Sequence, residues 1–237
     1  MTLRQARHPG LTRVDRDTVQ AQVYKKLRSA LMTGSLAPGD PVTLRSLASA
    51  FGTSEMPVRE ALRQLLAEHA LVSGPNRAIV VPMLTAEQLE EVRVIRVALE
   101  GMLAERAAAL VSAGDIKKLK VLHKDATRLV RAGDFKKYLA LNHKFHFLVY
   151  SAAGLPTALS IVESMWLRIG PALNFLLSKA HDAEKTSTGE EIEQVFERNH
   201  EHVVQALEHR DGPAARQAIA DDINDAADYF LSLIAVH

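Results

Sequence analysis

Apolar residues follow two different patterns in the first 84 positions of the chain. They recur every three or four residues through VQAQVYKKLRSALMTG, which predicts a helix beginning near Asp15 and ending at Gly34. The same spacing returns in TLRSLASAF and EMPVREALRQLLAEH, which are separated by Gly52-Thr53-Ser54 and therefore predict a helix-turn-helix. Two short β-type runs, ALVSG and AIVVP, then flank Pro75-Asn76-Arg77 and predict a hairpin, or wing.

The second helix of the predicted helix-turn-helix has two chemically different faces. At about 100° per residue, one face is apolar and consists of Val58, Ala61, Leu62, Leu65 and Leu66. The opposite face consists of Met56, Arg59, Glu60 and Arg63. Ser54 is expected at the N-cap, where its hydroxyl and the first amides of the helix can meet a phosphate, while Arg59 can reach a phosphate or a guanine. A solvated charged face is the alternative for this helix alone, but the surrounding elements favour a recognition helix.

Beyond Leu84 a helical pattern continues to the end of the chain. Breaks that contain glycine, proline or several small polar residues divide it into six predicted helices, at residues 85–112, 114–132, 134–151, 156–180, 187–209 and 212–235. Amphipathic helices in such a series pack as an antiparallel bundle. The predicted fold is mainly α, with a winged helix-turn-helix domain followed by an antiparallel six-helix bundle.

Charge separates the same two parts of the chain. Residues 1–84 carry 11 Lys and Arg against 6 Asp and Glu, whereas the remainder carries 18 against 22. A basic small module favours a polyanionic partner. We therefore expect a flexible basic tail at 1–14, a DNA-binding domain at 15–84 and an all-helical effector-binding and dimerisation domain at 85–237.

Composition excludes several classes of protein. The chain has 47% hydrophobic residues, only 5% aromatic residues and no cysteine, which excludes disulfide frameworks, thiolate metal sites and cysteine nucleophiles. Neither a membrane-spanning run nor a secretory leader is recognisable, so a cytoplasmic location without membrane association is expected. The common nucleotide-binding, serine-hydrolase and zinc-protease motifs do not occur, so no catalytic residue is predicted and the protein is not expected to be an enzyme.

Candidate metal ligands interrupt the apolar stripes of two predicted helices in the bundle. Asn142 lies at the centre of the stripe in the third helix, and His146 follows one turn later at its edge. In the fifth helix, His200 and His202 flank the stripe almost equally, so periodicity does not choose between them.

Two charged residues also fall on or near apolar stripes, in the first and the last predicted helices of the bundle. Asp222 approaches the stripe of the last helix, and Arg96 falls among the apolar residues of the first. Each residue alone is compatible with an ordinary satisfied polar group at a stripe edge. Together they predict a polar cavity, because burying these groups without partners is costly.

The run APGDPVTLRSLASAFGTSEMPVREALRQLLAEHALV resembles the winged-helix domain of the GntR family of bacterial transcription regulators. The resemblance implies that Arg45, Ser54 and Arg59 contact DNA. Glu55 and Met56 stand where the family usually has Arg and Thr, and Ala78 replaces a frequent glycine of the wing. The complete set of expected DNA-binding residues is Arg45, Ser54, Glu55, Met56, Arg59, Arg63, Asn76 and Arg77.

The stretches VRVIRVALEGMLAERAA, LNHKFHFLVYSAAG, WLRIGP and HEHVVQALEHRDGPAARQAI resemble the FCD ligand-sensing domain of the FadR subfamily, in its shorter VanR-like form. Many such domains hold a divalent metal, and the resemblance places its ligands at Asn142, His146, His200 and Asp222, selecting His200 over His202. Asn142 and Asp222 depart from the usual ligand types, but both offer oxygen. Zinc is therefore expected first, with nickel or manganese as alternatives.

Together these resemblances predict a homodimeric repressor that binds an operator in double-stranded DNA and is released by a small metabolite, typically an organic acid. Arg96 is the expected anchor for the carboxylate of that effector, and its signal is expected to cross the junction at 82–85. A constitutive DNA-binding protein with a purely structural bundle is the alternative. A metal-dependent hydrolase is a further alternative, although no residue is a clear candidate for its general base.

Overall fold

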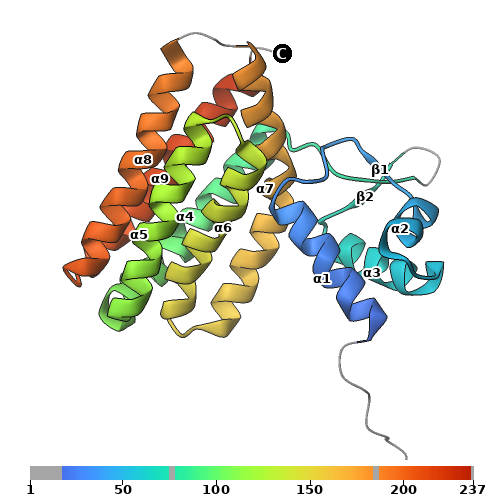
Figure 1. The fold of residues 1–237 in the computed structure, drawn as a ribbon, viewed down its shortest axis with the longest axis horizontal. Coiled ribbons are helices and arrows are strands. Elements are labelled where there is room, and N and C mark those ends of the chain that lie inside the picture. The colour runs from blue at the N-terminus through green and yellow to red at the C-terminus, as the bar shows by residue number, and fades with distance from the viewer. Residues whose placement is uncertain (1–17, 75–77, 184–186, 236–237) are drawn as a thin grey trace, which may run out of the picture.

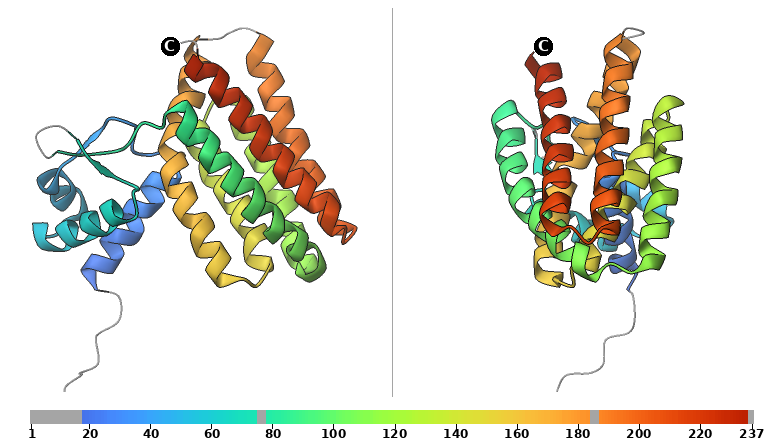
Figure 2. Two further views of the ribbon diagram at one scale, coloured as in Figure 1. Left: turned by 180° about the vertical axis from the view of Figure 1, so that it is seen from behind. Right: turned by 90° about the vertical axis from the view of Figure 1, so that its left-hand side faces the viewer.

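The computed structural model describes residues 18–74, 78–183 and 187–235 and consists mainly of helices (Figure 1). A small N-terminal domain lies beside a larger bundle of long helices, which confirms the predicted fold class. The views in Figure 2 show the bundle helices running alongside one another, with the small domain at one flank. The same ranges of the chain contain no helix whose length and apolar character would suit a membrane span.

The N-terminal domain contains three helices and three very short strands. Their bounds are α1 Val19–Met32, β1 Pro41–Val42, α2 Leu44–Phe51, α3 Glu55–Ala67, β2 Val72–Ser73 and β3 Ile79–Val80. Thr43 begins α2, because its side chain accepts a hydrogen bond from the amide of Ser46 at 3.2 Å. Gly52 ends α2 with a φ of 63°, a left-handed conformation that glycine adopts without strain.

The strands form an antiparallel sheet in the order β1-β3-β2. Strands β2 and β3 are the arms of the predicted hairpin, and their pairing joins Val72 to Val80 and Ser73 to Ile79. Strand β1 was not among the elements expected from the sequence, and it includes Pro41. Proline is tolerated there because β1 is an edge strand, where its missing N–H is not needed by a second neighbour. The expected wing residues Asn76 and Arg77 lie outside the described residues.

The six bundle helices agree with the predicted ones to within three residues at each end. They are α4 Ala86–Leu110, α5 Ala113–Arg131, α6 Phe135–Ala152, α7 Pro156–Ala183, α8 Ser187–Glu208 and α9 Gly212–Ala235. A capping box begins α4, since the side chain of Thr85 accepts from the amide of Gln88 while the side chain of Gln88 accepts from the amide of Thr85. Helix α4 packs along α9 and also contacts α6, α7 and α8, so its buried face reaches most of the bundle interior.

The two domains meet where α1 packs against α7. Gly170 brings the backbones very close, because a Cβ atom at this position would lie 2.4 Å from the carbonyl oxygen of Leu31. Asn174, one turn later on α7, donates from Nδ2 to the carbonyl oxygen of Gly34 at 2.7 Å. Arg28 on α1 also pairs with Glu163 on α7 at 3.0 Å. The helical bundle therefore has a specific contact with the N-terminal domain besides the covalent linker.

Candidate functional site

The outer face of α3 is exposed and carries the residues that the sequence placed there. Met56 is 65% exposed, the charged side chains of Arg59 and Arg63 are also open to solvent, and Val58 and Leu62 are buried on the opposite face. Each arginine has an acidic partner on the same helix: Arg59 lies 3.8 Å from Glu55, and Arg63 lies 3.0 Å from Glu60. Exposed ion pairs of this kind are weak and can be exchanged for phosphate contacts at small cost.

Ser54 and Arg45 lie beside this face and are both exposed. Ser54 is the N-cap of α3, but its side chain makes no capping hydrogen bond. Its hydroxyl and the first amides of α3 can therefore be offered to an anion, which the helix dipole favours at this end. Among the described residues, Arg45, Ser54, Glu55, Met56, Arg59 and Arg63 all lie on the accessible surface of the helix-turn-helix.

Among the residues whose burial the structure describes, seven polar or charged ones are buried in the bundle. They are Arg96 and Glu100 on α4, Asn142 and His146 on α6, Asn199 and His200 on α8, and Asp222 on α9. Asn199 bonds outward to Asp225, with its Nδ2 at 2.9 Å from the carboxylate. The others lie among the buried faces of their helices, where water does not offer alternative partners.

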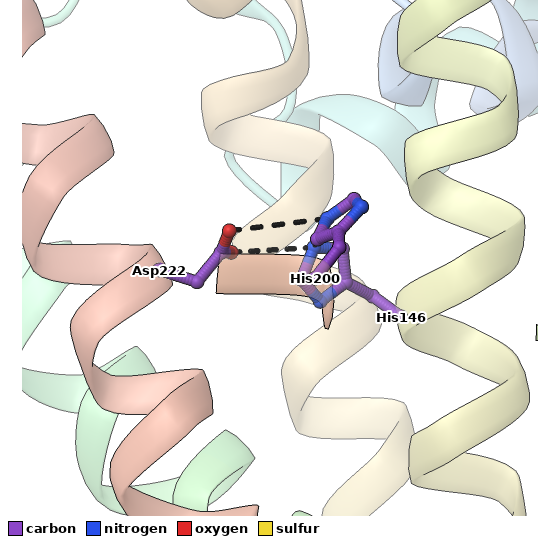
Figure 3. Close-up of side chains that lie close together, drawn as sticks. All are labelled: His146, His200 and Asp222. Carbon is purple, nitrogen blue, oxygen red and sulfur yellow. Dashed lines mark hydrogen bonds and ion pairs between the residues drawn. The ribbon is translucent and has the colours of Figure 1, made fainter. Parts of the chain in front are cut away.

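His146, His200 and Asp222 converge from three different helices (Figure 3). The Nε2 atoms of the two histidines are 3.3 Å apart. The carboxylate of Asp222 lies 3.4 Å from Nε2 of His146 and 3.8 Å from Nε2 of His200. This arrangement brings two imidazole nitrogens and a carboxylate to one point, which is a donor set suited to a divalent transition metal.

Burial shifts the pKa of each of these three groups toward its neutral form. It lowers the pKa of His200 to about 3 and holds the pKa of His146 well below its usual value, with the neighbouring His200 as the next cause. It also raises the pKa of Asp222 to about 7, against the opposing effect of Arg96. Neutral imidazole is the form that binds a metal, and a cation at this point would favour the charged form of the carboxylate.

Glu100 is the centre of a hydrogen-bond network beside the three converging residues. Its carboxylate accepts from Nε and Nη2 of Arg96 at 2.6 and 3.1 Å, from the hydroxyl of Tyr150 at 2.5 Å and from Nε1 of Trp166 at 3.1 Å. The same Tyr150 hydroxyl lies 3.0 Å from Nδ1 of His146. A continuous chain of polar contacts therefore joins Arg96 to the candidate metal ligands, and Tyr150 fixes the ring orientation of His146.

A cavity of about 50 Å³ adjoins this network. Its polar lining consists of Arg93, Arg96, Asn142, His146 and Asp222, and the rest of its wall is hydrocarbon and aromatic. The guanidinium of Arg96 also lies over the ring of Trp166, 4.8 Å from its centroid. A small anion with an apolar part would match this combination of surfaces.

The structure separates the two histidines that periodicity left undecided. His200 is buried with the candidate ligands, whereas His202 is exposed on the outside of α8. Asn142 lines the same cavity one helical turn before His146. Arg96 also lines it, but its guanidinium is not the isolated cation that the sequence implied, because it is paired with Glu100.

Sequence reasoning missed Glu100, Tyr150 and Trp166. The only local signal was the spacing of Glu100, four residues after Arg96, which on a helix places the two side chains on one face. Tyr150 follows His146 by the same interval. Trp166 comes from a different helix, so only the tertiary fold shows its contact with Glu100.

Comparison with known proteins agrees with both halves of this description. Residues 19–81 match the family described as "Bacterial regulatory proteins, gntR family", and residues 91–225 match the FCD domain. The HTH-type transcriptional regulator McbR of Escherichia coli is 30% identical over 213 residues, which cover 90% of this chain and 93% of McbR. The HTH-type transcriptional repressor RspR of Escherichia coli is 25% identical over 89% of this chain and 88% of its own length.

Solved structures show the same architecture over almost the whole chain. The structure described as E. coli McbR/YncC has a TM-score of 0.81 and 26% sequence identity, and the match covers 92% of this chain and 99% of that one. A regulator from Rhodococcus shares the fold with a TM-score of 0.70 at 19% identity, over 90% of this chain and 97% of that one. The chain belongs to the GntR family of bacterial regulatory proteins and is a ligand-responsive, DNA-binding transcription regulator with an FCD domain.

Proposed function

We propose that His146, His200 and Asp222 bind a divalent metal ion, and that this metal and Arg96 together bind a small carboxylate effector that releases the protein from its operator. The observation that carries the proposal is the convergence of the two Nε2 atoms, 3.3 Å apart, on the buried carboxylate of Asp222. A bound metal would supply a Lewis acid for one carboxylate oxygen of the effector.

The distances support zinc as the first choice of metal. Two ligands that are each about 2.0–2.1 Å from a tetrahedral zinc ion lie roughly 3.3 Å from each other. The separation of the histidines and the 3.4 Å between His146 and Asp222 are close to this value. Asn142 is proposed as a further oxygen ligand, since it lines the same cavity. Nickel and manganese remain alternatives for the experiment to distinguish.

The bidentate pair with Glu100 supports the proposal that Arg96 binds the carboxylate of the effector. Glu100 engages Nε and Nη2 of the guanidinium, so both of these donors face the glutamate. A carboxylate in the cavity can therefore use the remaining donors of a group whose plane is already fixed, so little side-chain entropy is lost on binding. Arg93, which lines the same cavity, is more exposed and is paired with Glu90 and Asp228.

The exposed face of α3 is proposed to enter the major groove of the operator. One short recognition helix covers only a half-site, so we propose that two copies of the chain bind an inverted repeat as a homodimer. We keep the division into a DNA-binding domain at 15–84 and a sensor domain at 85–237. Because the chromosome is the partner, we place the protein in the cytoplasm.

Helix α7 is proposed to carry the signal to the DNA-binding domain, in addition to the linker at 82–85. Trp166 and Ile169 line the cavity, while Gly170 and Asn174 contact the end of α1 within the next turn. Pro171 lacks an N–H, so the hydrogen-bond ladder of α7 is interrupted beside this contact. A ligand that displaces this part of α7 also displaces α1, because the backbones touch without intervening side chains.

The experiment that tests the metal assignment is elemental analysis of the purified protein and of three histidine variants. We expect about one zinc ion per chain, lost in His146→Ala and in His200→Ala and retained in His202→Ala, the matched control on the exposed side of α8. Loss of the metal in the His202 variant alone, or equal metal content in all variants, would contradict the assignment.

A further inference from the structure

The lining of the cavity beside the candidate metal ligands has a polar and an apolar part. Its charged and amide side chains come from α4, α6 and α9, whereas Leu89, Ile169, Leu173 and Phe230 give it an apolar wall. A small acid without any apolar group would make no favourable contact with this apolar wall. The apolar wall therefore indicates that the effector also has an apolar group, which the metal ligands alone do not indicate.

A second, smaller hollow continues from this wall. It measures about 20 Å³ and shares Leu89, Ile169, Leu173 and Phe230 with the first cavity. Its remaining lining residues are Met83, Leu84, Ala172, Leu176 and Ile234. Every residue in its lining has an apolar side chain, so it provides no favourable site for a charged or strongly polar group.

We infer that the second hollow is a subsite for the hydrocarbon group of the effector, which makes that effector a short aliphatic monocarboxylate. The inference rests on the proposed function, because the carboxylate head would lie at the metal and Arg96. Water-sized groups each need roughly 10–15 Å³ of such space. The two volumes therefore suit a head and a chain of only a few carbons, and exclude a long acyl chain unless the helices separate.

The position of the hollow also gives the hydrocarbon group a route to the DNA-binding domain. Met83 and Leu84 lie between strand β3 of the wing and helix α4. Ala172 follows Gly170 and Pro171 on α7, at the contact with α1. A hydrocarbon group in this hollow would therefore contact both connections between the domains.

The test uses zinc-loaded protein, calorimetric titration and three probes: acetate, propionate and butyrate. Transfer of each methylene from water to an apolar site strengthens binding by about fourfold. We expect this increase at each step, from acetate to propionate and again from propionate to butyrate. It should disappear in Ala172→Leu, which fills the hollow, while acetate binding stays at the parental value. Ala98→Leu, on the exposed face of α4, makes the same substitution away from the cavity and should behave like the parent.

Ile234→Trp provides a second blocking variant, because Ile234 is only partly buried at the edge of the hollow and is expected to accept a larger side chain. This variant tests the subsite if the Ala172→Leu protein does not bind zinc or does not fold. Equal affinity for the three acids, or an unchanged increase in both blocking variants, would overturn the subsite while leaving the proposed carboxylate sensor intact. Binding of zinc without binding of any of the three acids would overturn both.

Discussion

The outer face of α3 and the polar interior of the bundle carry similar residue types in opposite surroundings. On α3, Arg59 is half exposed and lies 3.8 Å from Glu55, with solvent around both groups. In the bundle, Arg96 and Glu100 form the same i,i+4 pair at 2.6 Å, with the glutamate fully buried. Exposed pairs such as the one on α3 contribute little to stability and can exchange partners with solvent or a ligand. The buried pair is part of a network in which removal of one partner would leave another charge uncompensated.

This difference determines where substitutions should act. Removing a charge from α3 should change DNA binding and leave the unfolding free energy almost unchanged. Removing a charge from the bundle interior leaves the oppositely charged partner buried and uncompensated. We therefore expect the free energy of unfolding to fall, in addition to any effect on binding. We therefore expect substitution of the same type of residue to act mainly on DNA binding in one domain and first on stability in the other.

The largest effect is expected for Glu100→Ala. It removes the acceptor of Arg96, Tyr150 and Trp166, and we expect the free energy of unfolding to fall by about 3–5 kcal/mol. Chemical denaturation followed by circular dichroism measures the change. Glu105→Ala is the matched control, since Glu105 forms an exposed pair with Arg216. A loss as small as that of the control would mean that the buried network is not structural.

A smaller effect is expected for Tyr150→Phe, which removes the hydroxyl beside Nδ1 of His146 and keeps the aromatic ring. Loss of such an outer partner typically lowers metal affinity by about 10–100-fold. Competition with a chelator of known affinity measures it. Tyr24→Phe removes a hydroxyl in the DNA-binding domain and should leave metal affinity unchanged. Parental metal affinity in the Tyr150 variant would remove this hydroxyl from the metal site.

Arg59→Ala tests the exposed face of α3. We expect operator binding to weaken by about 1–3 kcal/mol and its logarithmic salt dependence to fall by roughly one contact, because a phosphate or base contact is lost. The unfolding free energy should stay within about 0.5 kcal/mol of the parent. Arg128→Ala, an exposed arginine on α5, is the control. An unchanged operator affinity would exclude Arg59 from the interface.

The smallest effect is expected for Asn174→Ala at the contact between the domains. The lost hydrogen bond to Gly34 should cost about 1 kcal/mol of stability. Operator affinity without effector should remain near that of the parent, while the change caused by effector decreases. Ser160→Ala removes a local hydrogen bond on the same helix and serves as the control. A full effector response in the Asn174 variant would exclude this contact as the signalling route.

The sequence predicted the fold more completely than it predicted the buried network. Helix limits followed from periodicity, glycines and caps such as Thr43, all of which are local signals. Strand β1 was missed because it consists of only Pro41 and Val42, which are too few residues to show an alternating pattern, and pairing with β3 creates the strand. Local signals therefore predict where a helix or strand lies, but they do not predict which other element it pairs with or packs against.

The candidate site shows the same limit. Periodicity placed His146 and Asp222 on buried faces but treated His200 and His202 as equal, and only the packing of α8 in the structure distinguishes them. Glu100 was not singled out, because its spacing from Arg96 occurs equally on exposed helices. Its hydrogen bond from Trp166 joins residues that are 66 positions apart and meet only in the folded bundle.

The most direct test of the central claim is the operator affinity of zinc-loaded protein with and without butyrate. An operator selected from random DNA and followed by fluorescence anisotropy provides the measurement. We expect butyrate to weaken operator binding by tenfold or more, which corresponds to about 1.4 kcal/mol of coupling between the two sites. The same addition should have no effect on His146→Ala or on protein treated with a chelator. An operator affinity that is the same with and without butyrate in zinc-loaded protein would contradict the account.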